Sequence, residues 1–119
     1  SKRKEIIKSL NQVESIIKIR KTKQMLYLNS LNKSNKYQIY HFYDGSVPWR
    51  FNLLISQKYK KMFIKYALDN GLPISDWYPV VVDMFNEKKS KYINAYKFEK
   101  MIVNFPLLLD DYKIINICN

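Results

Sequence analysis

Apolar residues recur every three or four positions along the first quarter of the chain. These positions are Ile6, Leu10, Val13, Ile17, Met25, Leu28 and Leu31. This spacing is the period of an α-helix with one apolar face. It predicts a long amphipathic helix over Lys4–Leu31, ended by the loop-forming residues Asn32–Asn35. We expect the stripe of Ile6, Leu10, Val13 and Ile17 to pack against a sheet.

Two segments that follow are rich in aromatic and β-branched residues, as strands are. They are Tyr37–Tyr43 and Trp49–Ile55, and Asp44-Gly45 lies between them. An Asp-Gly pair between two such runs indicates a turn. The sequence therefore predicts two strands joined by a tight connection.

A second helix is predicted from Ser56 or Gln57 to Asn70, with Gly71 as its stop. Its apolar face is Tyr59, Met62, Phe63, Tyr66 and Ala67. On this assignment Lys58, Lys60, Lys61 and Lys65 lie in water, and Tyr59 packs inward rather than stacking on a nucleic-acid base.

The remainder of the chain alternates extended and helical patterns. Leu72–Ile74 is extended, 75–82 is a loop or short strand, and helices are expected over Asn94–Val103 and Asp110–Cys118. Asp110 and Asp111 are well placed at the start of the last helix. The order predicts an α+β fold in which a small antiparallel sheet packs with a long N-terminal helix and two or three further helices.

Length and charge bound the classes of protein that fit. A chain of 119 residues suits a single domain over 1–119. Its 21 Lys and Arg against 10 acidic residues give a net charge of +11, and residues 1–36 contribute +8 of it. A basic N-terminal third can bind nucleic acid, but only three of the basic residues are Arg, the residue that phosphate and base recognition favours. We therefore favour a solvated lysine-rich surface, with a basic nucleic-acid-binding or interaction module as the alternative.

The sequence offers no catalytic set and no metal ligands. His41 is the single histidine and lies among aromatic residues, which favours a structural role. Cys118 is the single cysteine, so it has no second cysteine to bond and no base beside it in sequence. The two glycines, Gly45 and Gly71, do not make a phosphate-binding loop. We predict no catalytic residue, no metal and no cofactor for this chain alone. No apolar run is long enough for a membrane span, and the single cysteine favours the cytoplasm.

Two short segments stand out as candidate binding residues. Arg50 follows Trp49 where a strand begins, and Trp77-Tyr78 precede Pro79 after a helix stop. An Arg can bind a phosphate or carboxylate through two hydrogen bonds, and flat aromatic rings suit a sugar or base. We expect Arg50 to lie near Trp77 or Tyr78. The alternatives are a surface Arg paired with Asp44 and tryptophans that only anchor the core or a strand edge.

At these residues the sequence resembles the C-terminal small domain of the DegT/StrS family of pyridoxal-phosphate (PLP)-dependent sugar aminotransferases. The similarity runs along nearly the whole chain, in short motifs. A long basic helix has a late Tyr in Arg20…Tyr27-Leu28, and a strand carries Pro48-Trp49-Arg50-Phe51. A helix closes with Leu68…Gly71-Leu72 before Tyr78-Pro79, and Asn104-Phe105-Pro106-Leu107 leads to a terminal helix.

The resemblance implies an enzyme that moves an amino group from glutamate to a nucleotide-linked keto-sugar, in amino-sugar or O-antigen polysaccharide biosynthesis. The family's large N-terminal domain holds the Schiff-base Lys and the PLP, and nothing here matches those motifs. The resemblance therefore implies a C-terminal domain or remnant that is inactive alone. Its partners would be a sugar nucleotide, a missing large domain and a second subunit, and its substrate-binding residues would be Arg50, Trp77 and Tyr78. The start at Ser1, ahead of a basic helix, also leads us to expect sequence upstream.

Overall fold

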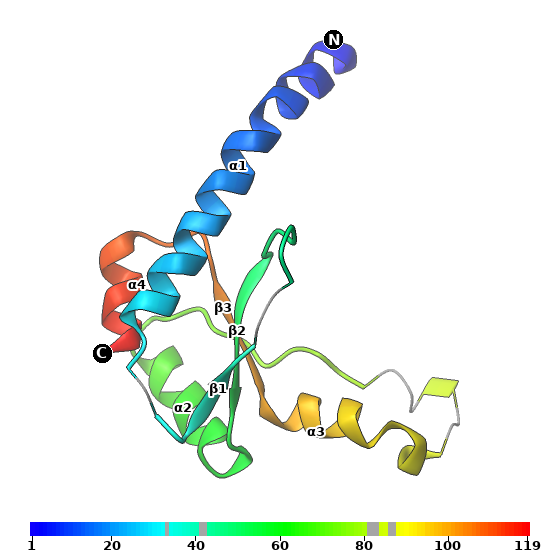
Figure 1. Cartoon of the computed structure of the whole chain (residues 1–119), viewed down its shortest axis with the longest axis vertical. Coiled ribbons are helices and arrows are strands. Elements are labelled where there is room, and N and C mark those ends of the chain that lie inside the picture. The colour runs from blue at the N-terminus through cyan, green and yellow to red at the C-terminus, as the bar shows by residue number, and fades with distance from the viewer. Residues whose placement is uncertain (33, 41–42, 81–83, 86–87) are drawn as a thin grey trace. The chain divides into compact units, whose positions relative to one another are not determined.

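The computed structural model describes residues 1–32, 34–40, 43–80, 84–85 and 88–119. In chain order the elements are α1 (Lys2–Ser30), β1 (Tyr37–Ile39), β2 (Arg50–Ile55), α2 (Gln57–Asp69), the 3₁₀ turn η2 (Lys89–Tyr92), α3 (Ile93–Met101), β3 (Ile102–Pro106) and α4 (Asp111–Cys118) (Figure 1). The predicted α+β class, with its long N-terminal helix and small antiparallel sheet, is confirmed.

The described residues group into two compact units. The first contains residues 1–31, 43–49 and 107–119, and therefore α1 and α4. The second contains residues 32–40 and 50–106 without the gaps given above, and therefore the sheet with α2, η2 and α3. Each unit has its own buried residues and is described by itself.

The second unit is built on an antiparallel sheet in the order β1-β2-β3. Phe51 and Leu53 of β2 lie opposite Phe105 and Val103 of β3, so their side chains share one face of the sheet. All four are almost fully buried. The Phe105 ring lies 6.3 Å from the Phe51 ring and 6.0 Å from the Phe63 ring of α2. Helix α2 therefore contributes to the apolar core on this face.

The opposite face carries a buried polar pair in the middle of the sheet. Asn52 lies directly across from Asn104, and both are more than nine-tenths buried. The backbone of Asn52 accepts from Tyr40, and the backbone of Asn104 exchanges two hydrogen bonds with Ser75. The Asn52–Asn104 pair is therefore a non-hydrogen-bonded pair, in which facing side chains come closest. Even so, the Oδ1 atom of each amide is buried without a hydrogen-bond partner.

Helix α2 is turned about its axis relative to the predicted amphipathic face. Met62 and Tyr66, expected inside, are exposed, whereas Lys60, expected in water, is buried together with Ala67. The prediction was right for Phe63 and Ala67. It was wrong for Met62, Tyr66 and Lys60, because apolar residues lie on two adjacent faces of this helix and either face matches the helical period. The Phe63–Phe105 contact and the burial of Ala67 select the face that includes Lys60.

The third strand also departs from the prediction. The helix expected over Asn94–Val103 ends at Met101, and the chain continues directly as β3. Ile102 and Val103 are β-branched and almost fully buried, which favours a strand once β2 offers a partner. Residues 72–74 form no strand, although Ser75 makes an isolated bridge to Asn104. Strand β1 ends at Ile39, so it is shorter than predicted. His41, Phe42 and residues 81–83 lie outside the described residues.

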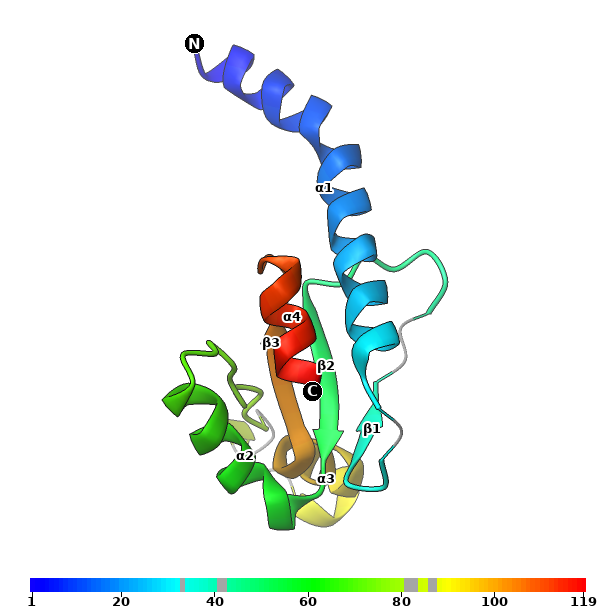
Figure 2. The same cartoon turned by 90° about the vertical axis from the view of Figure 1, so that its left-hand side faces the viewer.

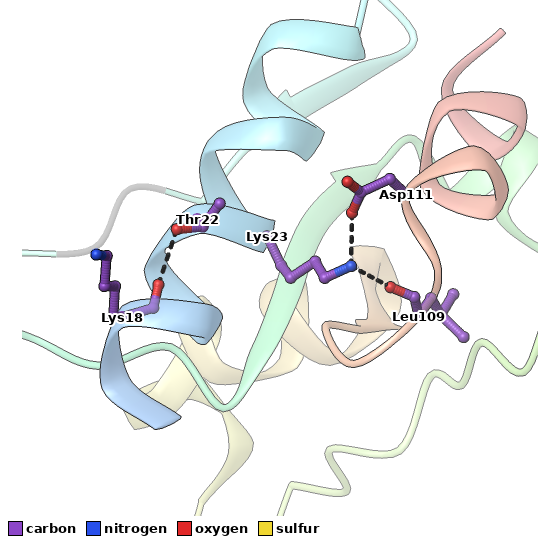
Figure 3. Close-up of polar contacts among 5 residues, drawn as sticks. All are labelled: Lys18, Thr22, Lys23, Leu109 and Asp111. Carbon is purple, nitrogen blue, oxygen red and sulfur yellow. Dashed lines mark hydrogen bonds and ion pairs between the residues drawn. The ribbon is translucent and has the colours of Figure 1, made fainter. Parts of the chain in front are cut away.

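In the first unit, the C-terminal half of α1 packs side by side with α4 (Figure 2). Tyr27 of α1 and Ile114 of α4 are fully buried there. The ammonium of Lys23 donates to the Leu109 carbonyl and the Asp111 carboxylate, each at 2.6 Å, and so links α1 to the start of α4 (Figure 3). The acidic start predicted for the last helix is thus observed, with a cation from another helix bound to it.

The N-terminal half of α1 does not bury its apolar stripe. Ile6 and Leu10 are 59% and 64% exposed, and Val13 is also exposed. Burial of the stripe is therefore not observed for Ile6, Leu10 and Val13, and Ile17 is half-buried. The helical period was correct, and α1 runs unbroken over Lys2–Ser30, but α4 reaches only the C-terminal half within this unit (Figure 2).

The unpartnered Oδ1 atoms of Asn52 and Asn104 lead to a prediction about stability. A double variant, Asn52→Leu with Asn104→Leu, should unfold with a free energy unchanged or raised by about 1–2 kcal/mol, because a buried acceptor without a donor costs free energy that a similarly sized apolar group does not. Urea denaturation measures this. Asn94→Leu, on the exposed surface of α3, is the matched control. A loss of more than about 1 kcal/mol in the double variant would mean that the amides are hydrogen-bonded after all.

The packing of α1 on α4 generates a pH prediction. Burial raises the pKa of the Cys118 thiol to about 11, and burial, with Cys118 as a smaller cause, raises the pKa of the Tyr27 hydroxyl. Both groups are protonated in the folded state at a pH where the unfolded chain has lost the proton. The contribution of Cys118 is therefore complete below about pH 9 and is lost as the pH rises through 11. The contribution of Tyr27 begins to fall above about pH 10, the ordinary pKa of its hydroxyl, and is lost at a higher pH than that of Cys118.

We expect the melting temperature to fall between pH 8.5 and 10.5, and to fall by at least about 4 °C less in Tyr27→Phe than in the unsubstituted chain. Circular dichroism at the two pH values measures the difference. Tyr43→Phe is the control, because Tyr43 is 91% exposed. An equal alkaline loss in all three proteins would contradict a role for Tyr27.

Candidate functional site

Arg50, the first predicted binding residue, opens β2 opposite Pro106 at the end of β3. It is half-buried and lies on the opposite face from Phe51, which is 1% exposed. Its side chain therefore stands on the same face as Asn52 and Asn104, away from the apolar core. This placement puts a half-buried arginine at a strand end.

Trp77 and Tyr78, the other predicted binding residues, lie in the Ser75–Val80 segment. Ser75 is held by two backbone hydrogen bonds to Asn104, at 3.0 and 2.6 Å. The Tyr78 ring meets the Phe98 ring of α3 edge-on at 6.4 Å. Trp77 is 74% exposed. The Trp77 indole is thus exposed to solvent, whereas Ser75 and Tyr78 on either side of it contact β3 and α3.

The sheet register places Arg50 and Tyr78 toward opposite ends of β3. Arg50 pairs with Pro106, where β3 ends, whereas Tyr78 packs on Phe98, four residues before β3 begins. A five-residue strand separates these two points. The pairing of the strands therefore does not bring Arg50 next to the two aromatic residues. A ligand that binds all three would have to contact both ends of β3.

Polar groups behind the Ser75–Val80 segment were not predicted from the sequence. The Lys60 ammonium donates to the Glu99 carbonyl at 2.8 Å and lies 3.6 Å from the Asp76 carboxylate. The Glu99 carboxylate in turn accepts from the Val80 backbone N–H at 3.2 Å. Three acidic or basic side chains from different parts of the second unit therefore meet around this segment. The sequence feature that could have indicated this group is the position of Lys60 next to the apolar face of α2.

In the first unit, Arg20 has a structural role that its place in the motif does not reveal. Its guanidinium donates to the Pro48 and Trp49 carbonyls at 3.2 and 3.4 Å. Pro48 is fully buried and Trp49 is exposed. Arg20 thus holds the backbone just ahead of β2, and Tyr27, the late Tyr of the same helix, is buried against α4.

Among the described residues, the buried lysine does not meet the requirements of PLP. A lysine that carries this cofactor as a Schiff base needs a free amine facing a pocket for the ring. Lys60 is the buried lysine among the described residues, and its ammonium is already bound by Glu99 and Asp76. The described part of the chain contains no group of three His, Cys, Asp or Glu side chains placed to share a metal ion. None of its helices has the length and apolar character needed to cross a membrane.

Comparison with known proteins finds likeness in structure. No family model and no curated protein sequence matches the chain. Spr1654 of Streptococcus pneumoniae, assigned as a sugar aminotransferase and solved in its PLP form, matches with a TM-score of 0.79 and 16% identity over 94% of this chain and 32% of its own. PseC of Helicobacter pylori, an aminotransferase of pseudoaminic acid biosynthesis, matches with a TM-score of 0.75 and 16% identity over 94% of this chain and 33% of its own.

A third match is the aminotransferase TlmJ of Streptoalloteichus hindustanus, with a TM-score of 0.74 and 12% identity over 92% of this chain and 31% of its own. The chain therefore has the fold of one segment of these aminotransferases, and it spans about a third of their length. At identities this low, the structural likeness shows the shared fold alone.

Proposed function

We propose that this chain is the C-terminal domain of a PLP-dependent sugar aminotransferase of the DegT/StrS kind, acting on a nucleotide-linked keto-sugar in amino-sugar or polysaccharide biosynthesis. The observation that carries the proposal is the fold, which matches nearly all of this chain to a third of three aminotransferases. On this proposal, residues 1–119 act as one domain, and the PLP belongs to a large domain outside it.

The exposed stripe of α1 supports a missing large domain. In proteins most of the stability of a helix comes from packing of its apolar face, and exposed apolar patches mark interaction surfaces. Ile6, Leu10 and Val13 lie exposed along one side of the N-terminal half of α1. We propose that the large domain covers them, and that a second subunit completes the enzyme as a dimer. We also propose a cytoplasmic location, supported by a single cysteine, Cys118, without a second to pair with.

Within this proposal, Arg50 contributes a charged contact to a phosphate or carboxylate of the substrate, and Trp77 and Tyr78 contribute flat surfaces for a sugar or base. The position of half-buried Arg50 at a strand end and the exposed Trp77 support these roles. Because they lie toward opposite ends of β3, they suit a substrate with two separated recognition groups, as a sugar nucleotide has.

A first experiment asks whether this chain can form a cofactor adduct by itself. Incubation of the 119-residue chain with PLP, followed by borohydride reduction, should label no single lysine preferentially, because the lysines whose side chains the structure describes are exposed or, like Lys60 and Lys23, already bound. Intact-mass spectrometry with peptide mapping measures the labelling. The matched control is Lys60→Arg, which should give the same pattern. A stoichiometric adduct on one lysine would overturn the proposal that the cofactor site lies in another domain.

A second experiment tests the substrate role in the longer enzyme that we propose contains this sequence. Arg50→Ala should raise the sugar-nucleotide KM about tenfold or more, since a charge-assisted hydrogen bond contributes about 1.5–3 kcal/mol. Arg50→Lys should lose less, because the charge is kept. Lys61→Ala, at an exposed position of α2, is the control. Steady-state kinetics unchanged by Arg50→Ala would remove Arg50 from the site.

A further inference from the structure

Lys60 is buried at a position where a lysine is costly. It is 8% exposed. Among the described residues, the other buried polar residues are Asn52 and Asn104, whose side chains carry no charge. Moving an ammonium out of water is unfavourable unless it is paired and hydrogen-bonded. Lys60 has both kinds of partner, the Glu99 carbonyl at 2.8 Å and the Asp76 carboxylate at 3.6 Å. An apolar residue would fill this position more simply, so the charge needs a reason beyond filling space.

The carbonyl that Lys60 binds belongs to the last turn of α3. The last four carbonyls of a helix lack partners within the helix, and a cation is favourable at that end. Glu99 lies within this turn. The ammonium therefore closes the end of α3 at the point where the chain turns into β3.

The same residue, Glu99, also holds the Ser75–Val80 segment. Its carboxylate accepts from the Val80 N–H at 3.2 Å, while its carbonyl is bound by Lys60. Lys60 reaches the segment a second time through Asp76. One ammonium thus connects α2 both to the beginning of the segment and, through Glu99, to its end.

Trp77 lies between these two attachment points. Its indole is 74% exposed, although Asp76 on one side and Val80 on the other are tied to the body of the unit. Tyr78 adds a backbone hydrogen bond to the Asp76 carbonyl at 3.0 Å and a ring contact with Phe98. A large aromatic side chain in water on a fixed backbone loses little freedom on binding, which is what preorganisation means.

We propose that Lys60 is a positioning residue for Trp77: its ammonium, shared between Glu99 and Asp76, fixes the backbone that presents the indole. That Trp77 contacts substrate rests on the proposed function. The fixing of the segment by Lys60 rests on the contacts described above.

The experiment measures local order in the 119-residue chain. Lys60→Met keeps the unbranched side chain and removes the charge, and Lys61→Met is the matched exposed control. We expect amide hydrogen exchange at Tyr78 and Val80 to accelerate at least tenfold in Lys60→Met. In a Trp49→Phe background, where Trp77 is the single tryptophan, its fluorescence anisotropy should fall. The melting temperature and exchange in β2 should stay unchanged or improve, since an apolar residue replaces a buried cation.

A purely structural lysine would change global stability without this local loosening. Unchanged exchange at Tyr78 and Val80 in Lys60→Met, or an equal acceleration throughout the second unit, would overturn the proposal. Asp76→Asn supplies a second measurement, because it alters the exposed partner alone and should accelerate exchange at Tyr78 in the same direction by a smaller factor. Exchange at Tyr78 unchanged in Asp76→Asn while Lys60→Met destabilises the whole unit would also count against it.

The outcomes separate this inference from the proposed function. In the longer enzyme, Trp77→Ala and Lys60→Met should both raise KM while kcat changes less, if Trp77 binds substrate. Local loosening in Lys60→Met together with an unchanged KM in Trp77→Ala supports the positioning role and contradicts the substrate role. A raised KM in Trp77→Ala without local loosening in Lys60→Met does the reverse.

Discussion

The pairing of β2 with β3 is the constraint on which the second unit depends. Its register sets Phe51 and Leu53 against Phe105 and Val103 on one face, and Asn52 against Asn104 on the other. A shift by one residue would bring the asparagines to the core face and the phenylalanines to the other, since side chains alternate strictly along a strand. The apolar face thus fixes the position of Arg50 and, through the Asn104–Ser75 bridge, the start of the segment that carries Trp77.

Cations bound to backbone carbonyls recur in both units. Arg20 binds the Pro48 and Trp49 carbonyls, Lys23 binds the Leu109 carbonyl, and Lys60 binds the Glu99 carbonyl. In the first two cases a helical side chain holds a backbone that is about to enter a regular element, and Lys60 binds a carbonyl in the last turn of α3. A high net positive charge therefore does not by itself indicate a nucleic-acid surface here, because part of it serves to satisfy carbonyls that helices and strands leave unpaired.

The sequence predicted elements best where local pattern alone decides them. Helix α1 has an unbroken helical period without Gly or Pro, and Gly71 adopts a φ of +73° just past α2, as a helix stop requires. Strand β3 was missed because Ile102 and Val103 follow helical residues directly, and only β2, some fifty residues earlier in the chain, supplies the hydrogen bonds that make them a strand. Lys60 was missed because a helix with two adjacent apolar faces can pack on either, and the choice depends on Phe105 and Glu99. Periodicity also cannot say what covers a stripe, as α1 demonstrates.

The candidate site illustrates how a small domain can serve a reaction whose chemistry lies elsewhere. A buried amine is the starting point for Schiff-base chemistry only when it is free to lose its proton and faces a cavity. Lys60 instead donates to the Glu99 carbonyl and lies beside the Asp76 carboxylate. The same burial that would suit a nucleophile therefore makes Lys60 a fixed cation that orders the backbone around Trp77. The charge of Lys60 thus fixes backbone geometry, and the proposed function assigns the bond-making steps to another domain.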